Sequence, residues 1–497
     1  MSHEPLPPEV DVAIVGGGIN GASLYHELSA EGYRVLLVDR GDFAAGTSQA
    51  SAMMIWGGLL YMKDWELATV ARLSASRDRL IAQQPSQIRA RSIRYIPVPG
   101  GRSRAFVQAA LYAYWLLGGA RRKRPRFDRD FEERSLLKDD RVSGALTYEE
   151  ASLESSDARF VLSWILHTAG HDSVARNYCA LESAGYDASR RLWRLDLADT
   201  RDGRAMEVRA RLVVNAAGGW TDAINRRNGL ESPYRHLLSR GVSMAVPREP
   251  GHHHHLAFDN GIGGNAMVLI PWGPVALWGS TDTVHPDMER DRRVETGDLR
   301  FLFAQLNRHL ARPVGPSDVV SLRCGVRAVA VPRHAKVNEH SPSLSRRHRI
   351  HVDSRAPWIS VYGGKLSGCT TLAHSVRMRV TGRLGAGTVP PRPARLDDHL
   401  PEPPVETFPG LERPVVSAVW SAAHEQCRTL DDYLRRRTNI AQWVRRGGLG
   451  ANLEHLDHVR SVALALHGGN TARVAHDLDQ YRTRVDQEWR LLEGAAI

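Results

Sequence analysis

The sequence predicts an α/β protein with a nucleotide-binding unit at its N-terminus. A glycine-rich turn separates a continuous apolar segment from a helical one. The chain has 497 residues, which is enough for several packed units. Hydrophobic residues make up 42% and charged residues 24%, proportions that exclude a disordered or fibrous chain.

The first expected elements form a Rossmann-like βαβ unit. Residues 10–15 predict a buried strand, because apolar and β-branched residues follow one another without polar alternation. A helical pattern covers residues 22–30, and a second apolar strand is expected at 34–38.

The turn between the first strand and the helix predicts a dinucleotide site. Gly16, Gly18 and Gly21 occupy the positions of a G-x-G-x-x-G motif, where side chains would block the turn, the pyrophosphate and the helix packing. Asp39 ends the second strand, where a carboxylate accepts hydrogen bonds from ribose hydroxyls. The alternative is a glycine turn with a purely structural role.

Five ordered segments further along the chain carry a second pattern. They are residues 39–51 with 57–61, then 212–220, 278–282, 325–327 and 360–366. Together they resemble the FAD-dependent glycerol-3-phosphate dehydrogenases, within the amino-acid-oxidase-like (DAO) flavoproteins. Residues 425–438 also resemble part of that family's C-terminal helical region.

The resemblance implies an FAD-binding domain of the glutathione-reductase type and an inserted substrate domain with a mixed sheet. The expected limits are 1–75, 157–235 and 340–388 for the FAD-binding domain, and 76–156 and 236–339 for the substrate domain. A proline-rich stretch at 389–414 predicts a linker. Residues 415–497 are expected to form a small helical cap.

The resemblance also implies which residues contact FAD. Glycines permit close backbone approach, and hydroxyl groups can serve the phosphates and the ribityl chain. The implied contacts are Gly16, Gly18, Gly21, Asp39, Thr47, Ser48, Ser51, Ala217, Gly218, Gly364, Lys365 and Leu366.

Arg327 and Lys365 match the two family segments that bring an arginine and a lysine towards the flavin, and both are expected to act in catalysis and substrate binding. Arg327 is permanently charged and would stabilise an anion or a developing oxyanion, with a buried salt bridge as the alternative. Lys365 is one of five lysines in an arginine-rich chain. It would bind the substrate's anionic group or assist proton removal, with a surface lysine as the alternative.

The substrate side departs from the family at four positions. Met53, Trp56 and Leu60 stand where the family carries a lysine, a histidine and an arginine, and Ser243 replaces a further histidine. Because a phosphate dianion is usually held by several charge-assisted donors, this loss favours a wider and more apolar substrate pocket. The alternative is that Met53, Trp56 and Leu60 pack in the core and other basic side chains reach the phosphate.

Other aromatic and histidine-rich segments have two interpretations each. Trp272 and Trp278 either extend the apolar pocket wall or pack in the core. Residues 252–255 are four adjacent histidines without a metal-ligand spacing, so they are expected on an exposed loop and no metal site is expected. The four cysteines are far apart and no secretory leader precedes them, which favours a reducing, cytoplasmic setting without disulfides.

Residues 105–117 predict an apolar helix, and a basic segment follows at 121–126. This pair would suit peripheral contact with the inner membrane surface, as in the resembling dehydrogenases when they pass electrons to quinone. A buried helix with a solvated basic turn is the alternative. The net charge of +11 is not attributed to nucleic acid, because no binding module is recognisable. No apolar run is long enough to span a bilayer.

The predicted reaction is hydride transfer from a hydroxyl-bearing carbon to flavin N5, as in the glycerol-3-phosphate dehydrogenases. The expected substrate is a polyol phosphate or another small alcohol, and quinone or oxygen would accept the electrons. Two alternatives remain open. The first is an oxidase of a larger alcohol or amine, and the second is a flavin-binding scaffold without turnover.

Overall fold

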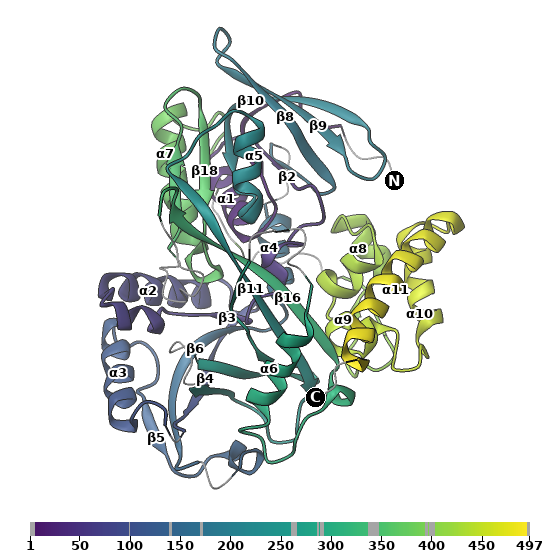
Figure 1. The fold of residues 1–497 in the computed structure, drawn as a ribbon. Coiled ribbons are helices and arrows are strands. Elements are labelled where there is room, and N and C mark those ends of the chain that lie inside the picture. The colour runs from purple at the N-terminus through teal and green to yellow at the C-terminus, as the bar shows by residue number, and fades with distance from the viewer. Residues whose placement is uncertain are drawn as a thin grey trace.

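Two β-sheets with flanking helices lie beside a separate group of C-terminal helices (Figure 1). The computed structural model describes residues 5–98, 100–138, 142–168, 172–259, 266–285, 288, 293–335, 347–392, 396 and 403–494. The predicted domain limits that fall at 1–4, 340–346 and 495–497, and parts of the predicted linker at 393–395 and 397–402, lie outside these residues.

The first sheet contains the predicted βαβ unit. Its strands are β1 (Glu9–Val15), β2 (Val35–Val38), β7 (Val174–Arg176), β8 (Cys179–Asp187), β9 (Leu192–Asp199), β10 (Ala205–Asn215), β17 (Arg349–Val352) and β18 (Trp358–Tyr362). The order along the sheet is β17-β18-β10-β1-β2-β7, and β8 and β9 extend it next to β10. Strands β1, β2, β7, β10 and β18 are parallel to one another, so their carboxyl ends meet at one edge.

The second sheet is mixed, as predicted for the substrate domain. Its strands are β3 (Met54–Ile55), β4 (Ile88–Ile96), β5 (Arg126–Asp128), β6 (Ala145–Leu153), β11 (Tyr234–Pro247), β12 (His255–Asp259), β13 (Ala266–Trp272), β14 (Val275–Gly279), β15 (Thr283–His285) and β16 (Ser321–Pro332). Strand β12 is parallel to β4, whereas β11, β14 and β16 pair in antiparallel fashion. The α/β fold class is confirmed.

Helices cover both sheets. They are α1 (Ile19–Ala30), α2 (Leu67–Gln83), α3 (Arg104–Leu117), α4 (Asp157–Leu166), α5 (Thr221–Arg227), α6 (Thr296–Leu306) and α7 (Cys369–Leu384). Helix α1 packs between α4 and α7 on the first sheet. Helix α6 packs on β11 and β14 of the second.

The C-terminal region forms its own small core beside the sheets (Figure 1, yellow). Its elements are α8 (Ala418–His424), the π-helical turn η8 (Asp432–Arg437), α9 (Ile440–Trp443), α10 (Leu456–Leu466) and α11 (Thr471–Glu493). Residues 418–494 are called the cap below. Tyr433, Ile440 and Tyr481 are among its buried residues.

Two predicted segments contain a strand that pairs with a strand outside the segment. Strand β3 lies within the predicted FAD-binding segment 1–75, yet it pairs with β6 of the second sheet. The predicted linker includes a strand, β19 (Val405–Glu406), which pairs with β20 (Val415–Val416).

Candidate functional site

A cavity of about 1290 Å³ lies where the strand ends of the first sheet meet the second sheet. Its lining includes residues at or after the ends of β1, β2, β10 and β18, together with residues of β11 and β16. This edge of an open α/β sheet is the usual place for a ligand. Most of the predicted site residues line it: Gly16, Gly18, Asp39, Thr47, Ser48, Ser51, Trp56, Leu60, Ala217, Gly218, Ser243, Arg327, Gly364, Lys365 and Leu366.

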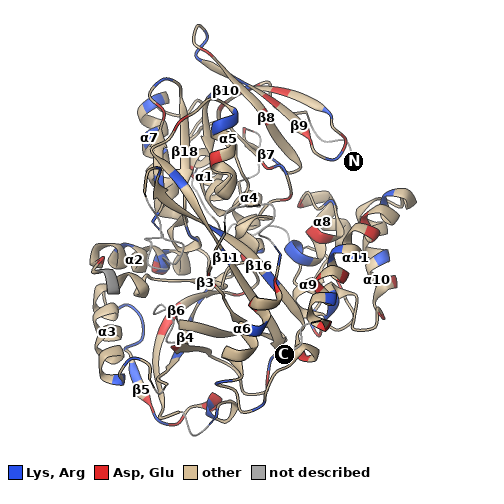
Figure 2. Ribbon diagram, viewed as in Figure 1, with Lys and Arg blue, Asp and Glu red and all other residues tan. Residues whose placement is uncertain are grey.

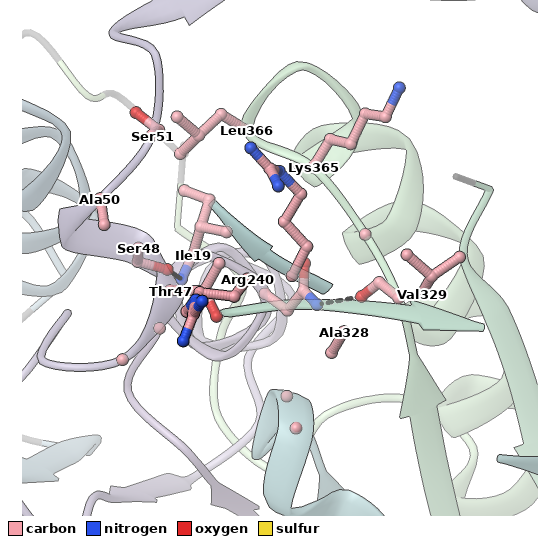
Figure 3. A pocket seen from close by; sticks show the side chains of 18 of the residues that line it. Ile19, Thr47, Ser48, Ala50, Ser51, Arg240, Ala328, Val329, Lys365 and Leu366 are labelled. Atoms are coloured by element: carbon pink, nitrogen blue, oxygen red, sulfur yellow. Dashed lines mark hydrogen bonds between the residues drawn. The ribbon is translucent and has the colours of Figure 1, made fainter. Parts of the chain in front are cut away.

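The glycine turn brings the N-terminus of α1 to the cavity. Gly16 has a φ of +108°, and a Cβ there would lie 2.7 Å from the Cα of Ala217. Gly21 does not line the cavity, because it faces the turn itself, and a Cβ there would lie 1.8 Å from the carbonyl oxygen of Gly16. The backbone N–H of Ile19 donates to the hydroxyl of Ser48 at 3.0 Å, as Figure 3 shows. Backbone amides at a helix N-terminus favour an anionic ligand.

Asp39 directly follows β2 and lines the cavity. Its carboxylate accepts hydrogen bonds from the backbone N–H of Gly17 at 2.6 Å and of Gly41 at 2.9 Å. Burial raises the pKa of Asp39 to about 6, and these two backbone donors oppose the shift.

Asn20 is a cavity residue that the sequence reasoning missed. Its Nδ2 donates to the carbonyl oxygen of Gly363 at 2.9 Å, so it ties α1 to the segment after β18. Its Oδ1 is buried and has no partner among the described residues. Gly364 has a φ of +111°, and a Cβ there would lie 2.6 Å from that Oδ1. The position of Asn20 inside the G-x-G-x-x-G motif was the signal that could have identified it.

Arg327 lies on β16 and lines the cavity. Its Nη2 donates to the hydroxyl of Ser280 at 2.5 Å, and its Nη1 lies 3.5 Å from a carboxylate oxygen of Asp282. Both partners of this ion pair keep a quarter of the side chain exposed. Gly241 on β11 makes room for the guanidinium, because a Cβ there would lie 2.3 Å from Nη2.

Lys365 lines the cavity from the segment after β18, and in Figure 3 its side chain extends away from Thr47 and Ser48 of the N-terminal segment. Its ammonium nitrogen lies 4.3 Å from the ring centroid of Tyr61. This cation–π contact holds a positive charge beside Tyr61, which also lines the cavity.

Arg240 is a second residue that the sequence reasoning missed. It lines the cavity on β11, and its guanidinium pairs with Glu295 at 2.7 Å and with Asp298 at 3.2 Å. The cavity lining therefore includes the cationic side chains of Arg240, Arg327 and Lys365 together with the carboxylates of Asp282, Glu295 and Asp298.

Met53 does not line the cavity, in contrast to the prediction. Its side chain is fully buried in the core between the two sheets, while the neighbouring Met54 lines the cavity. Trp272 and Trp278 are also core residues rather than pocket walls. Trp272 donates to the carbonyl oxygen of Ser155 at 2.6 Å, and the indole of Trp278 is fully buried.

The four adjacent histidines do not form an exposed loop. His252 and His255 are buried, so the prediction is wrong for these two residues. His254 lies 2.9 Å from Glu133, which also pairs with Arg94 at 2.5 Å. His252 and His255 are buried by the packing of β12 and the preceding turn, whereas His253 stays exposed.

Helix α3 buries one face and exposes apolar side chains on another. Val107, Leu111 and Tyr114 are buried, whereas Phe106 is 62% and Leu116 is 64% exposed. No helix in the described part of the chain combines the length and hydropathy needed to cross a membrane. The positive charge is spread over many elements rather than gathered in one (Figure 2).

The residues present in the cavity fit FAD. The glycine turn lets a pyrophosphate approach the start of α1, and Asp39 stands where ribose hydroxyls would be accepted. The unpartnered Oδ1 of Asn20 at the start of α1 and the close approach of Gly364 to it leave a buried acceptor in the cavity lining that a bound ligand could satisfy. A cavity of this volume is also large enough for an extended dinucleotide and a small substrate together.

Comparison with known proteins supports this fit. Residues 11–371 match the FAD dependent oxidoreductase (DAO) family. A glycerol-3-phosphate dehydrogenase from Pseudomonas tolaasii is 28% identical over 378 residues, covering 75% of this chain and 71% of that protein. Glycerol-3-phosphate dehydrogenase 2 of Mycobacterium tuberculosis strain H37Rv is 26% identical over 382 residues, 73% of this chain and 62% of that protein. The chain thus spans less than two thirds of the length of this mycobacterial relative.

The fold also matches a solved structure. The glycerol-3-phosphate dehydrogenase from Bacillus halodurans, complexed with FAD, superimposes with a TM-score of 0.71 at 18% identity, covering 98% of this chain and 96% of that one. The family match covers most of the chain, and its cofactor fits the cavity. The protein is therefore a member of the FAD dependent oxidoreductase family.

Proposed function

We propose that this protein oxidises a hydroxyl-bearing carbon of a small polyol phosphate, in the manner of the glycerol-3-phosphate dehydrogenases. The observation that carries the proposal is that Arg327 and Lys365 line the same cavity, as do Gly363 and Gly364. The relatives named for this activity add support.

Arg327, Lys365 and Tyr61 would each have a separate role in the reaction. Bound FAD would accept the hydride. Arg327 would orient the anionic end of the substrate, because its guanidinium is a permanent cation in the cavity lining and is held in place by Ser280 and Asp282. Lys365 would donate from its ammonium to the reacting hydroxyl oxygen and stabilise the negative charge that develops there as the hydroxyl proton leaves to water. Tyr61 keeps the lysine at this place through its ring.

The test is turnover of glycerol 3-phosphate by the FAD-loaded protein with a dye as electron acceptor. Lys365→Met should lower kcat about 100-fold or more with FAD still bound, because losing one group that stabilises a developing negative charge on oxygen usually costs at least that much. Arg327→Met should mainly raise KM. Lys123→Met is the matched control, since this lysine pairs with Glu149 on the surface, and it should leave both constants unchanged. Normal turnover by the Lys365 variant would remove this residue from the mechanism.

A second candidate substrate is a larger alcohol or amine. Trp56 and Leu60 line the cavity where the resembling family carries polar groups, and the carboxylates of Asp282, Glu295 and Asp298 compete for the nearby arginines. An amine would suit these carboxylates better than a phosphate would. Reduction by amines but not by glycerol 3-phosphate, in the same assay, would favour this candidate.

Electron transfer to a membrane quinone is the proposed route of reoxidation, with oxygen as the alternative acceptor. The exposed Phe106 and Leu116 of α3 and the basic residues after it support peripheral contact with a lipid surface. Reoxidation of the reduced protein by a short-chain quinone, compared with air-saturated buffer, distinguishes the two acceptors.

A further inference from the structure

A buried ionic cluster joins the cap to the segment that forms one wall of the cofactor cavity. We call it the cap clamp; it consists of Asp42, Gln49, Arg435, Arg436 and Arg437. The carboxylate of Asp42 accepts from Nε of Arg436 at 2.6 Å and from both terminal nitrogens of Arg437 at 2.7 and 2.8 Å. The side chains of Asp42 and Arg437 are almost completely buried. Because these charges are desolvated, losing one partner would leave another unpaired.

Gln49 connects the ionic cluster to the cavity wall through hydrogen bonds at both polar atoms of its side-chain amide. Its Oε1 accepts from Arg435 and from Arg436, both at 3.1 Å. Its Nε2 donates to the carbonyl oxygen of Ala45 at 2.6 Å. Ala45 lines the cavity, as do Thr47 and Ser48 beside it. The clamp is therefore one residue away from groups that would contact FAD.

The cap side of the clamp is fixed by further buried contacts. Arg436 also pairs with Asp431 and, at 2.6 Å, with Asp432. The hydroxyl of Tyr178, which precedes β8 of the first sheet, donates to Asp432 at 2.7 Å. Although burial alone would raise the pKa of Asp42, Arg437 and Arg436 lower it, so the carboxylate stays charged within the clamp.

The cap itself contributes no residue to the cavity lining within the described part of the chain, where the lining ends at Ser367. The cap also lies beyond residues 11–371, the part that matches the family. The cap contacts the chain around the cavity at several places, among them Tyr178 before β8 and Ser321 on β16, and the wall segment 42–51 is a contacted segment that itself supplies cavity-lining residues between positions 45 and 51. The clamp supplies direct side-chain bonds to that segment.

We propose that Arg436, Arg437 and Gln49 are positioning residues for the cofactor. They hold the wall segment 42–51 in the conformation that binds FAD, so docking of the cap and binding of FAD stabilise each other. Such coupling is reciprocal, because each event changes the equilibrium of the other by the same factor. The inference rests on FAD as the cofactor and is independent of which substrate is oxidised.

The test is FAD affinity of the full-length apo-protein, measured by quenching of flavin fluorescence. Gln49→Met removes the link to the wall without removing a charge, and it should weaken FAD binding at least about fivefold, the lower end of usual coupling between sites. Arg437→Lys keeps the charge but loses the two-pronged contact with Asp42. It should bind FAD with an affinity between those of Arg437→Met and the unsubstituted protein.

The matched control is Arg446→Met, which breaks an ion pair with Asp486 inside the cap, 2.7 Å long, that does not touch the wall. This variant should bind FAD as tightly as the unsubstituted protein. The thermal unfolding temperature of each apo-protein reports how much each substitution destabilises the fold in the absence of FAD. If Gln49→Met and Arg437→Lys unfold at lower temperature but bind FAD normally, the clamp serves stability alone and the proposal is overturned.

Amide hydrogen exchange tests the reciprocal half of the proposal and does not depend on any variant that fails to fold. FAD should slow exchange of the amides of η8 and α9 in the unsubstituted protein, although these elements do not line the cavity. Unchanged exchange in the cap on saturation with FAD would contradict the proposed coupling. Neither measurement involves substrate, so failure here is distinct from failure of the proposed oxidation.

Discussion

Gly241 determines where the guanidinium of Arg327 lies, because a Cβ at this position would stand 2.3 Å from its Nη2. We expect Gly241→Ala to displace the guanidinium and to raise KM for an anionic substrate about tenfold, the usual effect of losing one charge-assisted hydrogen bond. FAD affinity should stay unchanged, since Gly241 does not line the cavity. Steady-state kinetics and an FAD titration measure the two effects; an unchanged KM would contradict the assigned position of Arg327.

Asp39 makes the stability of the apo-protein depend on pH. Burial raises its pKa to about 6 in the folded protein, whereas the pKa of an unfolded aspartate is about 3.9. The folded state therefore keeps its proton over a range in which the unfolded chain has lost it. The free energy of unfolding should decrease by roughly 2 kcal/mol as pH rises from about 4 to about 6.

Chemical denaturation of the apo-protein at several pH values measures this dependence. Asp39→Asn has no titrating group at this position and should flatten the decrease between pH 4 and 6. An identical slope in the variant would assign the dependence to other groups.

Sequence patterns do not predict which of two neighbouring residues lines the cavity. Met53 and Met54 are adjacent and chemically identical, yet only Met54 lines the cavity. Which of two neighbours faces inward depends on the pairing of β3 with β6, a contact between residues about 100 positions apart that no local pattern encodes. Trp56 and Leu60 do reach the cavity, and their role in substrate binding stays a prediction.

The sequence predicts helix α3 but not which of its apolar side chains are exposed. Its apolar residues predict the helix, but the mixture of buried Leu111 and exposed Phe106 and Leu116 appears only in the structure. We expect the double variant Phe106→Ser, Leu116→Ser to lower binding to anionic phosphatidylglycerol vesicles about tenfold or more, because two apolar side chains would no longer insert.

Co-sedimentation with vesicles measures this binding. Val419→Ser is the control, because Val419 is 61% exposed on the cap and far along the chain from α3. Equal sedimentation of the double variant and the unsubstituted protein would show that α3 is not the contact surface.

The βαβ unit was predictable for a physical reason. Strand, turn and helix are local in sequence, and Gly16 and Gly21 fill positions where the structure leaves no room for a side chain. Non-local features were not predictable. Asp42 lies 394 and 395 residues before its partners Arg436 and Arg437. Arg240 was not distinguishable from other arginines in the sequence, because its partners Glu295 and Asp298, at the start of α6, are also distant along the chain.

At the scale of the whole molecule, three distant parts of the chain meet around one cavity. The first sheet supplies the glycine turn and Asp39, the second sheet supplies Arg327, and the segment after β18 supplies Lys365. The cap stands outside this cavity and is joined to its wall by the cap clamp. The proposed function assigns FAD to the glycine turn and Asp39 and the substrate to Arg327 and Lys365, which line the same cavity.

The most direct test is the absorbance of the bound flavin under anaerobic conditions after addition of glycerol 3-phosphate, with dithionite as the control for reducible FAD. The proposed function predicts rapid bleaching in the unsubstituted protein and slow or no bleaching in Lys365→Met. If dithionite bleaches the flavin but neither glycerol 3-phosphate nor a panel of larger alcohols and amines does, the protein is not the oxidoreductase proposed here.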